Sequence, residues 1–144
     1  VHTHKSTYED LKDVVELCHK YGMLVDAYIA HPSDRHLFGI PAERPTQVAE
    51  TAKRMQDLGV DLIGLMTGMS YEGVAAGEIP VPVRERLEAM LKVVSVPTLA
   101  EGGINAVNFK AFIGTGVNVL VVGTAFDDIA RKAVGETVNI FLGR

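Results

Sequence analysis

The stretch VPTLAEGGINAVNFKAFIGTGVNVLVVGTAF, residues 96–126, decides how the rest of this chain is interpreted. It predicts a strand over 96–100, a helix over 105–115, a strand over 117–122 and a further helix that begins near Asp127. Each strand runs into glycine, and each glycine precedes a predicted helix. Such turns let an anion approach backbone N–H groups at the positive end of a helix. Two of them after consecutive parallel strands predict one phosphate-binding site.

The same alternation of strands and helices continues upstream. Apolar runs predict strands over 1–4, 23–30 and 60–67, and apolar stripes predict helices over 6–20, 45–58 and 83–94. Ser6 and Glu9 have the spacing of a capping box at the start of the first helix. The longest irregular stretch, 31–44, follows a strand. Strict alternation of short apolar strands with helices predicts a parallel sheet with right-handed crossovers.

Five βα units are too few to close a barrel of eight. The chain begins inside a strand-like segment at Val1, and its glycine turns follow the last two strands, where eight-unit barrels bind phosphate. We therefore expect residues 1–144 to be one partial domain, the C-terminal five units of a TIM-type barrel. An open doubly wound sheet is the alternative. An edge strand at Val1 would leave backbone groups unpaired, so we expect a homodimer or poor solubility.

The composition narrows the class of protein. The chain has 144 residues, 47% of them hydrophobic and 22% charged, with a net charge of −4. The acidic balance argues against a broad nucleic-acid surface. The single cysteine, Cys18, excludes an intrachain disulfide and a multi-cysteine metal site. No apolar run approaches the roughly 20 residues that span a bilayer, and no signal peptide is visible, so a cytoplasmic location is expected.

Several short motifs together carry a resemblance to a known superfamily. They are Lys20-Tyr21-Gly22, Val25-Asp26, Leu58-Gly59-Val60-Asp61-Leu62-Ile63, Thr67-Gly68, Ala76-Gly77, Glu101-Gly102-Gly103-Ile104 and Val121-Val122-Gly123-Thr124-Ala125. With them the chain resembles the ribulose-phosphate-binding (β/α)8 barrels. It is most similar to the group of 3-hexulose-6-phosphate synthase and 3-keto-L-gulonate-6-phosphate decarboxylase, which belongs with orotidine 5′-phosphate decarboxylase. The resemblance implies that Gly102, Gly103, Gly123 and Thr124 hold the phosphate of a small sugar.

The resemblance also implies a reaction. These enzymes make or break a carbon–carbon bond through an enediolate, so a lyase or synthase of the aldolase or decarboxylase type is expected. A Mg²⁺ ion or a lysine must then stabilise the developing negative charge. The group carries an Asp-x-Lys-x-x-Asp motif on a strand that would lie before Val1. It usually has a histidine where this chain has Met66.

Two other functions compete with the lyase. Ribulose-phosphate 3-epimerases have a methionine near the position of Met66 and an acidic residue before the Gly-Gly pair. N-acetylmannosamine-6-phosphate 2-epimerases share Ala100-Glu101-Gly102 closely. In the second family the glutamate before glycine transfers a proton, which favours an isomerase here. The missing histidine at Met66 motivates the third alternative, a non-catalytic module that binds a phosphorylated ligand.

Three residues are the catalytic candidates. Glu101 ends a strand directly before a glycine turn, where its carboxylate can transfer a proton or bond neighbouring loop N–H groups. Asp26 lies within an apolar strand and needs a partner, so an ion pair competes with catalysis. Thr67 ends its strand and could bond a sugar hydroxyl. Asp61 follows a helix-ending glycine and is expected at the non-catalytic end. We assign no metal-binding residues and expect no organic cofactor.

Overall fold

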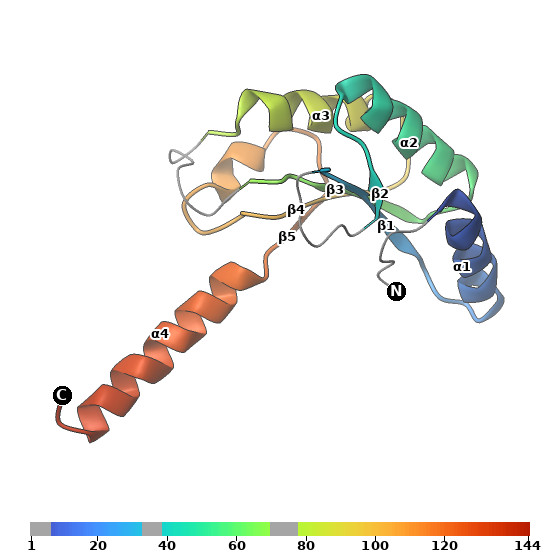
Figure 1. Ribbon diagram of the computed structural model, residues 1–144. Helices are drawn as coiled ribbons and strands as arrows, with labels where there is room; N and C mark the ends of the chain where they lie inside the picture. The colour runs from blue at the N-terminus through green and yellow to red at the C-terminus, as the bar shows by residue number, and fades with distance from the viewer. Residues whose placement is uncertain (1–6, 33–38, 70–77) are drawn as a thin grey trace.

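The computed structural model describes residues 7–32, 39–69 and 78–144. Apart from β2, which follows β1 directly, strands and helices alternate along the chain (Figure 1), which confirms the predicted α/β class. In order, the elements are α1 (Tyr8–Lys20), β1 (Asp26–Ala30), β2 (Ile40–Pro41), α2 (Pro45–Asp57), β3 (Leu62–Met66), α3 (Val81–Leu91), β4 (Thr98–Glu101), the 3₁₀ helix η1 (Phe109–Phe112), β5 (Val119–Val121) and α4 (Thr124–Phe141). The strand predicted over 1–4 lies outside the described residues.

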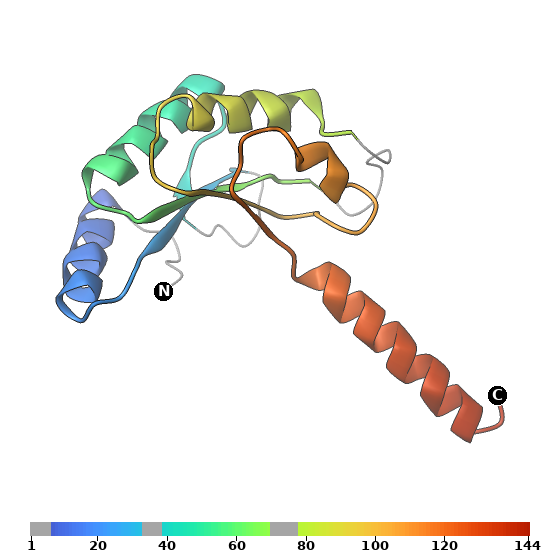
Figure 2. The same cartoon turned by 180° about the vertical axis from the view of Figure 1, so that it is seen from behind.

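The strands form one parallel sheet in the order β2-β1-β3-β4-β5. Alternate residues of a strand point to opposite faces of the sheet. On one face Ile29, Ile63 and Ala100 join a buried core with apolar residues of α1, α2 and α3. Figures 1 and 2 show α2 and α3 side by side over this face. Helices gathered on one face are typical of the wall of a barrel, whereas a doubly wound sheet carries them on both.

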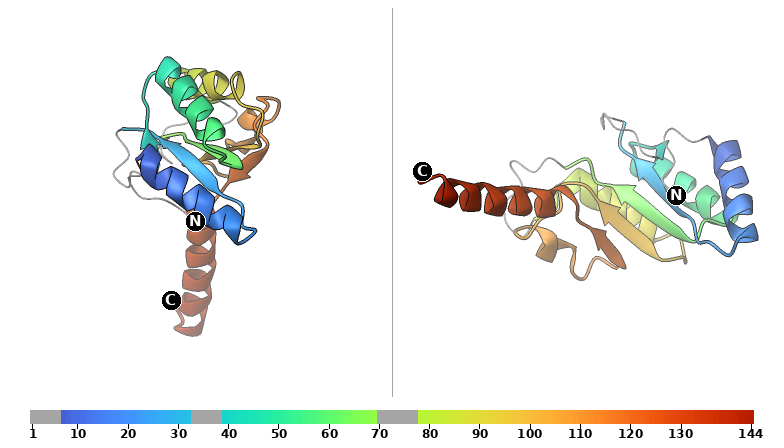
Figure 3. Two further views of the ribbon diagram at one scale, coloured as in Figure 1. Left: turned by 90° about the vertical axis from the view of Figure 1, so that its right-hand side faces the viewer. Right: turned by 90° about the horizontal axis from the view of Figure 1, so that it is seen from below.

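The opposite face of the sheet carries the polar candidates. Tyr28 of β1 is level with Gly64 of β3, which is level with Leu99 of β4. One step toward the carboxyl ends, Met66 is level with Glu101. Figure 3 (right) looks onto this face, where the strands lie in front of α2 and α3. In a closed barrel this face would point inward.

Helix α4 leaves the sheet and projects away from it (Figures 1 and 2). It begins at Thr124, three residues before the predicted start, and has no buried residue. Its apolar side chains include Phe126, which is 64% exposed, and Phe141, which is 86% exposed. Within the described part of the chain this stripe has no partner. The homodimer stays a prediction.

The helix predicted over 105–115 is wrong, because only one turn of 3₁₀ helix, η1, forms there. Two asparagines bond the local backbone in place of helical bonds. The Asn105 Oδ1 accepts from the N–H groups of Val107 (2.8 Å) and Asn108 (3.1 Å), and the Asn108 Oδ1 accepts from the Asn105 N–H (2.9 Å). Side chains of this kind offer the backbone an alternative to helix. Gly114 and Gly116 then take positive φ angles.

Two smaller features also differ from the prediction. The capping box of α1 uses Thr7 and Asp10, one residue later than the predicted pair. The stretch predicted as an irregular loop contains β2, which pairs with the end of β1. Gly39 permits this approach, because a Cβ there would overlap the carbonyl oxygen of Tyr28. A two-residue strand of this kind has no periodicity that a sequence pattern can reveal.

Asp61 lies at the amino end of β3, as predicted, and ties three segments together. Its Oδ2 lies 2.8 Å from the Nε2 of His19 and accepts from the N–H of Val25, also at 2.8 Å. These hydrogen bonds, with the one from His19 the larger cause, hold the pKa of Asp61 below its usual value. The carboxylate therefore stabilises the fold above the pKa of an unfolded aspartate, and this stability is lost as the pH falls through the folded pKa.

We expect Asp61→Asn to lower the free energy of unfolding by about 1 kcal/mol at pH 7. The gap from the unsubstituted chain should shrink below pH ~4, the usual aspartate pKa. Urea unfolding at pH 7 and pH 3 measures both effects. Asp57→Asn is the control, because its ion pair with Lys53 is exposed and should contribute little. Equal losses in the two variants at pH 7 would contradict the assignment.

Candidate active site

The glycine turns and the candidate glutamate gather at one edge of the sheet. Glu101 is level with Val121, so the turn after β4 and the turn after β5 both leave from the carboxyl edge. Thr67 and Gly68 follow β3 at the same edge. His31 follows β1 there, and a Cβ on Gly68 would lie 3.2 Å from its ring. The edge predicted to carry the site therefore brings together segments from four strands.

Tyr28 and Glu101 interact across the face that points away from the helices. The half-buried Glu101 carboxylate acts on the Tyr28 hydroxyl both through its negative charge and as a hydrogen-bond acceptor. Burial, then the negative charge of Glu101, then this hydrogen bond and the charge of Asp26 raise the pKa of Tyr28 well above its usual value. Tyr28 therefore stays a hydrogen-bond donor through neutral pH.

Gly64 is the residue that makes this pair geometrically possible. Tyr28 stands on β1 and Glu101 on β4, with β3 between them. The Tyr28 ring crosses β3 directly over Gly64. A Cβ on Gly64 would overlap the Cδ1 and Cε1 atoms of that ring and lie 3.0 Å from its Cζ. Any larger residue in the middle of β3 would occupy the space that the ring uses.

Asp26 lies farther from this edge than the sequence suggested. It is the first residue of β1 and is level with Leu62, at the amino ends of the strands. It shares a face with Tyr28, and its charge contributes to the raised pKa of that residue. The structure thus brings Asp26 within electrostatic reach of the pair, while its catalytic role stays a prediction.

Thr67 connects the loop after β3 to the loop after β4. Its Oγ1 donates to the carbonyl oxygen of Gly102 at 2.5 Å and accepts from the N–H of Met69 at 3.1 Å. Its N–H donates to the carbonyl oxygen of Glu101 at 2.8 Å. The side chain is 2% exposed. Because the one hydroxyl proton is already donated, this geometry favours a structural link over contact with a sugar.

The first glycine turn is built around backbone that only glycine adopts readily. Gly102 and Gly103 have φ angles of 101° and 66°. A Cβ on Gly103 would lie 2.7 Å from the carbonyl oxygen of Met69, and the carbonyl oxygen of Gly103 accepts from the Asn108 Nδ2 at 2.8 Å. Because no α-helix follows, this turn lacks the helix dipole that the sequence predicted.

The second glycine turn does begin an α-helix. Gly123 is the N-cap of α4 and has open space around it. The N–H groups of Phe126 and Asp127 donate to the Gly123 carbonyl oxygen. Within the described chain this leaves the N–H groups of Thr124 and Ala125 as donors for an anion at the helix start. Of the two predicted turns, only this one gains the positive electrostatic potential of an α-helix start.

The described residues do not assemble a metal site by themselves. Residues 7–32, 39–69 and 78–144 contain no group of three or more His, Cys, Asp or Glu side chains that could hold an ion. Asp26 and Glu101 share a face but stand at opposite ends of their strands. The Mg²⁺ expected from the resemblance stays a prediction.

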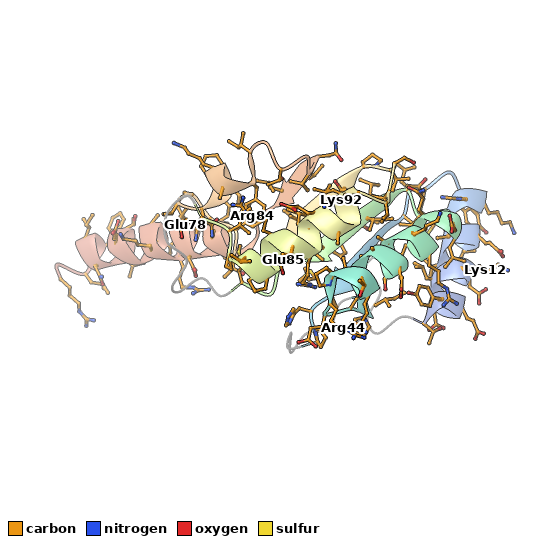
Figure 4. All side chains as sticks on the ribbon, turned by 90° about the horizontal axis from the view of Figure 1, so that it is seen from above. Lys12, Arg44, Glu78, Arg84, Glu85 and Lys92 are labelled. Atoms are coloured by element: carbon orange, nitrogen blue, oxygen red, sulfur yellow. The ribbon has the colours of Figure 1, made fainter. Side chains whose placement is uncertain are left out.

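Arg86 is a buried cation behind the same edge and was not among the residues predicted from the sequence. It is 3% exposed, while Arg84, Glu85 and Lys92 of the same helical region lie on the outer surface (Figure 4). Its Nη1 donates to the carbonyl oxygens of Met66 (3.2 Å) and Thr67 (3.4 Å), and its Nη2 donates to that of Ala42 (3.2 Å).

The hydrogen-bonding capacity of the Arg86 guanidinium is not fully used. Its Nε is buried without a hydrogen-bond partner. Burial lowers the pKa of Arg86, although the charge of Glu43 opposes this. One sequence signal pointed to it, since Arg86 falls on the apolar stripe of α3 that holds Val83, Leu87 and Met90. Tyr28 had a similar signal, because it lies two residues from Asp26 on the same strand face.

Comparison with known proteins identifies the fold. The sequence matches no protein-family model and no curated protein. The HMG-CoA lyase from Brucella melitensis superposes on 78% of the chain with a TM-score of 0.55 and 19% identity. The YdjI aldolase from Escherichia coli K12 superposes on 91% with a TM-score of 0.59 and 23% identity. The fold is that of part of a TIM-type barrel.

The chain is similar to less than half of each of these two proteins. The chain spans 39% of the length of the lyase structure and 45% of that of the aldolase. At these identities the likeness shows the arrangement of strands and helices, and the activities belong to those two proteins. No helix among the described residues is long and apolar enough to cross a membrane.

Proposed function

We propose that this chain is part of a sugar-phosphate lyase or synthase, similar to 3-hexulose-6-phosphate synthase, that works through an enediolate. The observation that carries the proposal is the Tyr28–Glu101 pair, which lies on the inner face of a barrel wall. Glycine turns flank it at the carboxyl edge, where barrel enzymes place their chemistry. The sequence resemblance and the barrel match to a lyase and an aldolase support the same class.

Glu101 is the proposed base. Its carboxylate accepts the proton from the carbon beside the sugar carbonyl, the electron pair of that C–H bond forms the C=C bond, and the carbonyl oxygen takes the negative charge. Protonated Glu101 is a weaker acceptor, so the Tyr28 hydroxyl can donate to the new oxyanion instead. The enediolate carbon then attacks an aldehyde carbon, and the aldehyde oxygen takes the proton back from Glu101.

The two glycine turns are the proposed phosphate clamp. The N–H groups of Gly102, Gly103, Gly123 and Thr124 would hold the phosphate and so fix the distance from Glu101 to the reacting carbon. The open space around Gly123 and the start of α4 support this role more strongly than the first turn does.

An epimerase is the second candidate, because the same pair can also move a proton without breaking a carbon–carbon bond. Delivery of a proton by a second acid on the opposite side of the carbon, while Glu101 keeps the proton that it removed, would invert the configuration. This reading is favoured by the position of Glu101 directly before the Gly102–Gly103 turn. The two functions share the enediolate and differ only in its fate.

We expect Glu101→Gln to lower the rate by about 10² to 10⁴-fold and Tyr28→Phe by about 10²-fold, since each removes one proton-transfer or oxyanion contact. The gene product that contains this chain is assayed for formaldehyde release from hexulose 6-phosphate and for exchange of the sugar α-proton in deuterated solvent. Tyr21→Phe is the control, because Tyr21 is 67% exposed. Formaldehyde release favours the lyase, and exchange of the α-proton without cleavage favours the epimerase. Phosphate binding with neither reaction overturns both and leaves a binding module.

A further inference from the structure

Arg86 holds the carboxyl edge of the sheet together from behind. Its guanidinium contacts the carbonyl oxygens of Met66 and Thr67, at the end of β3, and that of Ala42, just after β2. Neither strand neighbours the other, because β1 lies between them. One rigid, planar group thus spans the ends of two strands and fixes the backbone of both.

Thr67 connects Arg86 to the proposed base through hydrogen bonds of its backbone. The carbonyl oxygen of Thr67 accepts from Arg86, and its N–H donates to the carbonyl oxygen of Glu101. Its hydroxyl donates to the carbonyl oxygen of Gly102. Glu101 and Gly102, at the end of β4, are therefore both bonded to Thr67, which is one of the three residues that Arg86 contacts. Two hydrogen bonds separate the guanidinium from the backbone of Glu101.

The cost of burying Arg86 argues that the contact has a use beyond packing. Arg86 is 3% exposed, its Nε has no hydrogen-bond partner, and its described hydrogen-bond acceptors are all backbone carbonyl oxygens, although the charge of Glu43 also acts on it. Replacing a buried ion pair with apolar residues of similar volume is often neutral or stabilising, because burying charge costs desolvation energy. Core packing alone would be served as well by methionine.

We propose that Arg86 is a positioning residue that sets the backbone of Glu101 through Thr67. This inference rests on the proposed function for its kinetic consequence, but its structural consequence does not. Gly103 has a separate anchor, because its carbonyl oxygen accepts from the buried side chain of Asn108. Loss of Arg86 is therefore expected to disturb Glu101 and Gly102, which Thr67 bonds directly, more than Gly103 or the Gly123 turn, so that kcat falls further than phosphate affinity.

The structural arm of the test measures amide hydrogen exchange in the gene product that contains the chain. In Arg86→Met the Thr67 N–H is expected to exchange at least about tenfold faster, because local opening reports the loss of a restraint. The Ile63 N–H, which donates to Pro97 at the amino end of the same strand, should keep its rate. Arg84→Met on the outer surface is the control for both. Unchanged exchange at Thr67, or equal acceleration at Ile63, would overturn the proposal.

The kinetic arm uses the gene product that contains the chain. Arg86→Met is expected to lower kcat at least about tenfold, with the dissociation constant of inorganic phosphate changed less than twofold. Arg86→Lys should recover part of kcat, since an ammonium can reach one strand end but not both. Equal losses of kcat and phosphate affinity would indicate general damage and contradict positioning. If the unsubstituted protein has no activity, the proposed function fails, and the exchange arm still decides the role of Arg86.

Discussion

Gly64→Ala is expected to displace the Tyr28 ring and to break its hydrogen bond to Glu101. The added Cβ would overlap two ring carbons, and β3 cannot retreat because β1 and β4 pair with it on both sides. Overpacking of this kind typically costs about 1–3 kcal/mol. Urea unfolding should show this loss of stability. Activity should fall about as far as in Tyr28→Phe, because both changes remove the same contact.

Gly135→Ala is the matched control for Gly64→Ala. Gly135 lies within α4, and a Cβ there has no atom within 4 Å. Alanine is favoured over glycine in an exposed helix, so this change should stabilise the chain by up to about 1 kcal/mol. A second test pairs Gly64→Ala with Tyr28→Leu, where the smaller side chain should relieve part of the penalty. A Gly64→Ala variant as stable as the unsubstituted chain would show that the ring does not need this space.

Gly123→Asp is expected to weaken phosphate binding strongly while leaving the fold intact. The position is exposed, has ample room and is the N-cap of α4, where aspartate is a favoured residue. The new carboxylate would occupy the place of the anion and repel it. Like charges about 4 Å apart near a protein surface cost roughly 1–4 kcal/mol, so the affinity for inorganic phosphate should fall at least about tenfold.

Gly135→Asp supplies the control for charge alone. It adds the same carboxylate to the same helix, one residue before Glu136 and far along α4 from its start. Phosphate affinity, measured by calorimetry or by phosphorus NMR, should be unchanged. Gly103→Asp is a poorer probe, because any Cβ there collides with Met69 and would damage the turn regardless of charge. Equal affinities in Gly123→Asp and the unsubstituted chain would remove α4 from the clamp.

Much of the fold could be predicted because its signals are local. The short apolar runs of Asp26–Ala30 and Leu62–Met66, which alternate along the chain with amphipathic helical stripes, favour buried parallel strands. Glycines with positive φ, such as Gly59, mark helix ends that the sequence also predicted. The helix over 105–115 failed because Asn105 and Asn108 bond the backbone locally, an effect that apolar spacing does not register.

The candidate site was only partly predictable, because its key contacts join residues far apart in sequence. Glu101 and the glycine turns were found from their position after a strand. The crossing of Tyr28 over Gly64 depends on the register of three strands, which no single stretch of sequence contains. Arg86 stands on an otherwise apolar stripe, and that anomaly is the signal that could have identified it.

The pKa of Tyr28 is the measurement that tests the central claim most directly. The chain has four tyrosines, and ring-labelled NMR spectra of the chain and of Tyr28→Phe assign the Tyr28 signal. A free tyrosine is half ionised near pH ~10. We predict that Tyr28 is still protonated there, and that Glu101→Gln lowers its pKa by removing a negative charge. Titration of Tyr28 with a midpoint near pH ~10, unaffected by Glu101→Gln, would contradict the pair on which the proposed function rests.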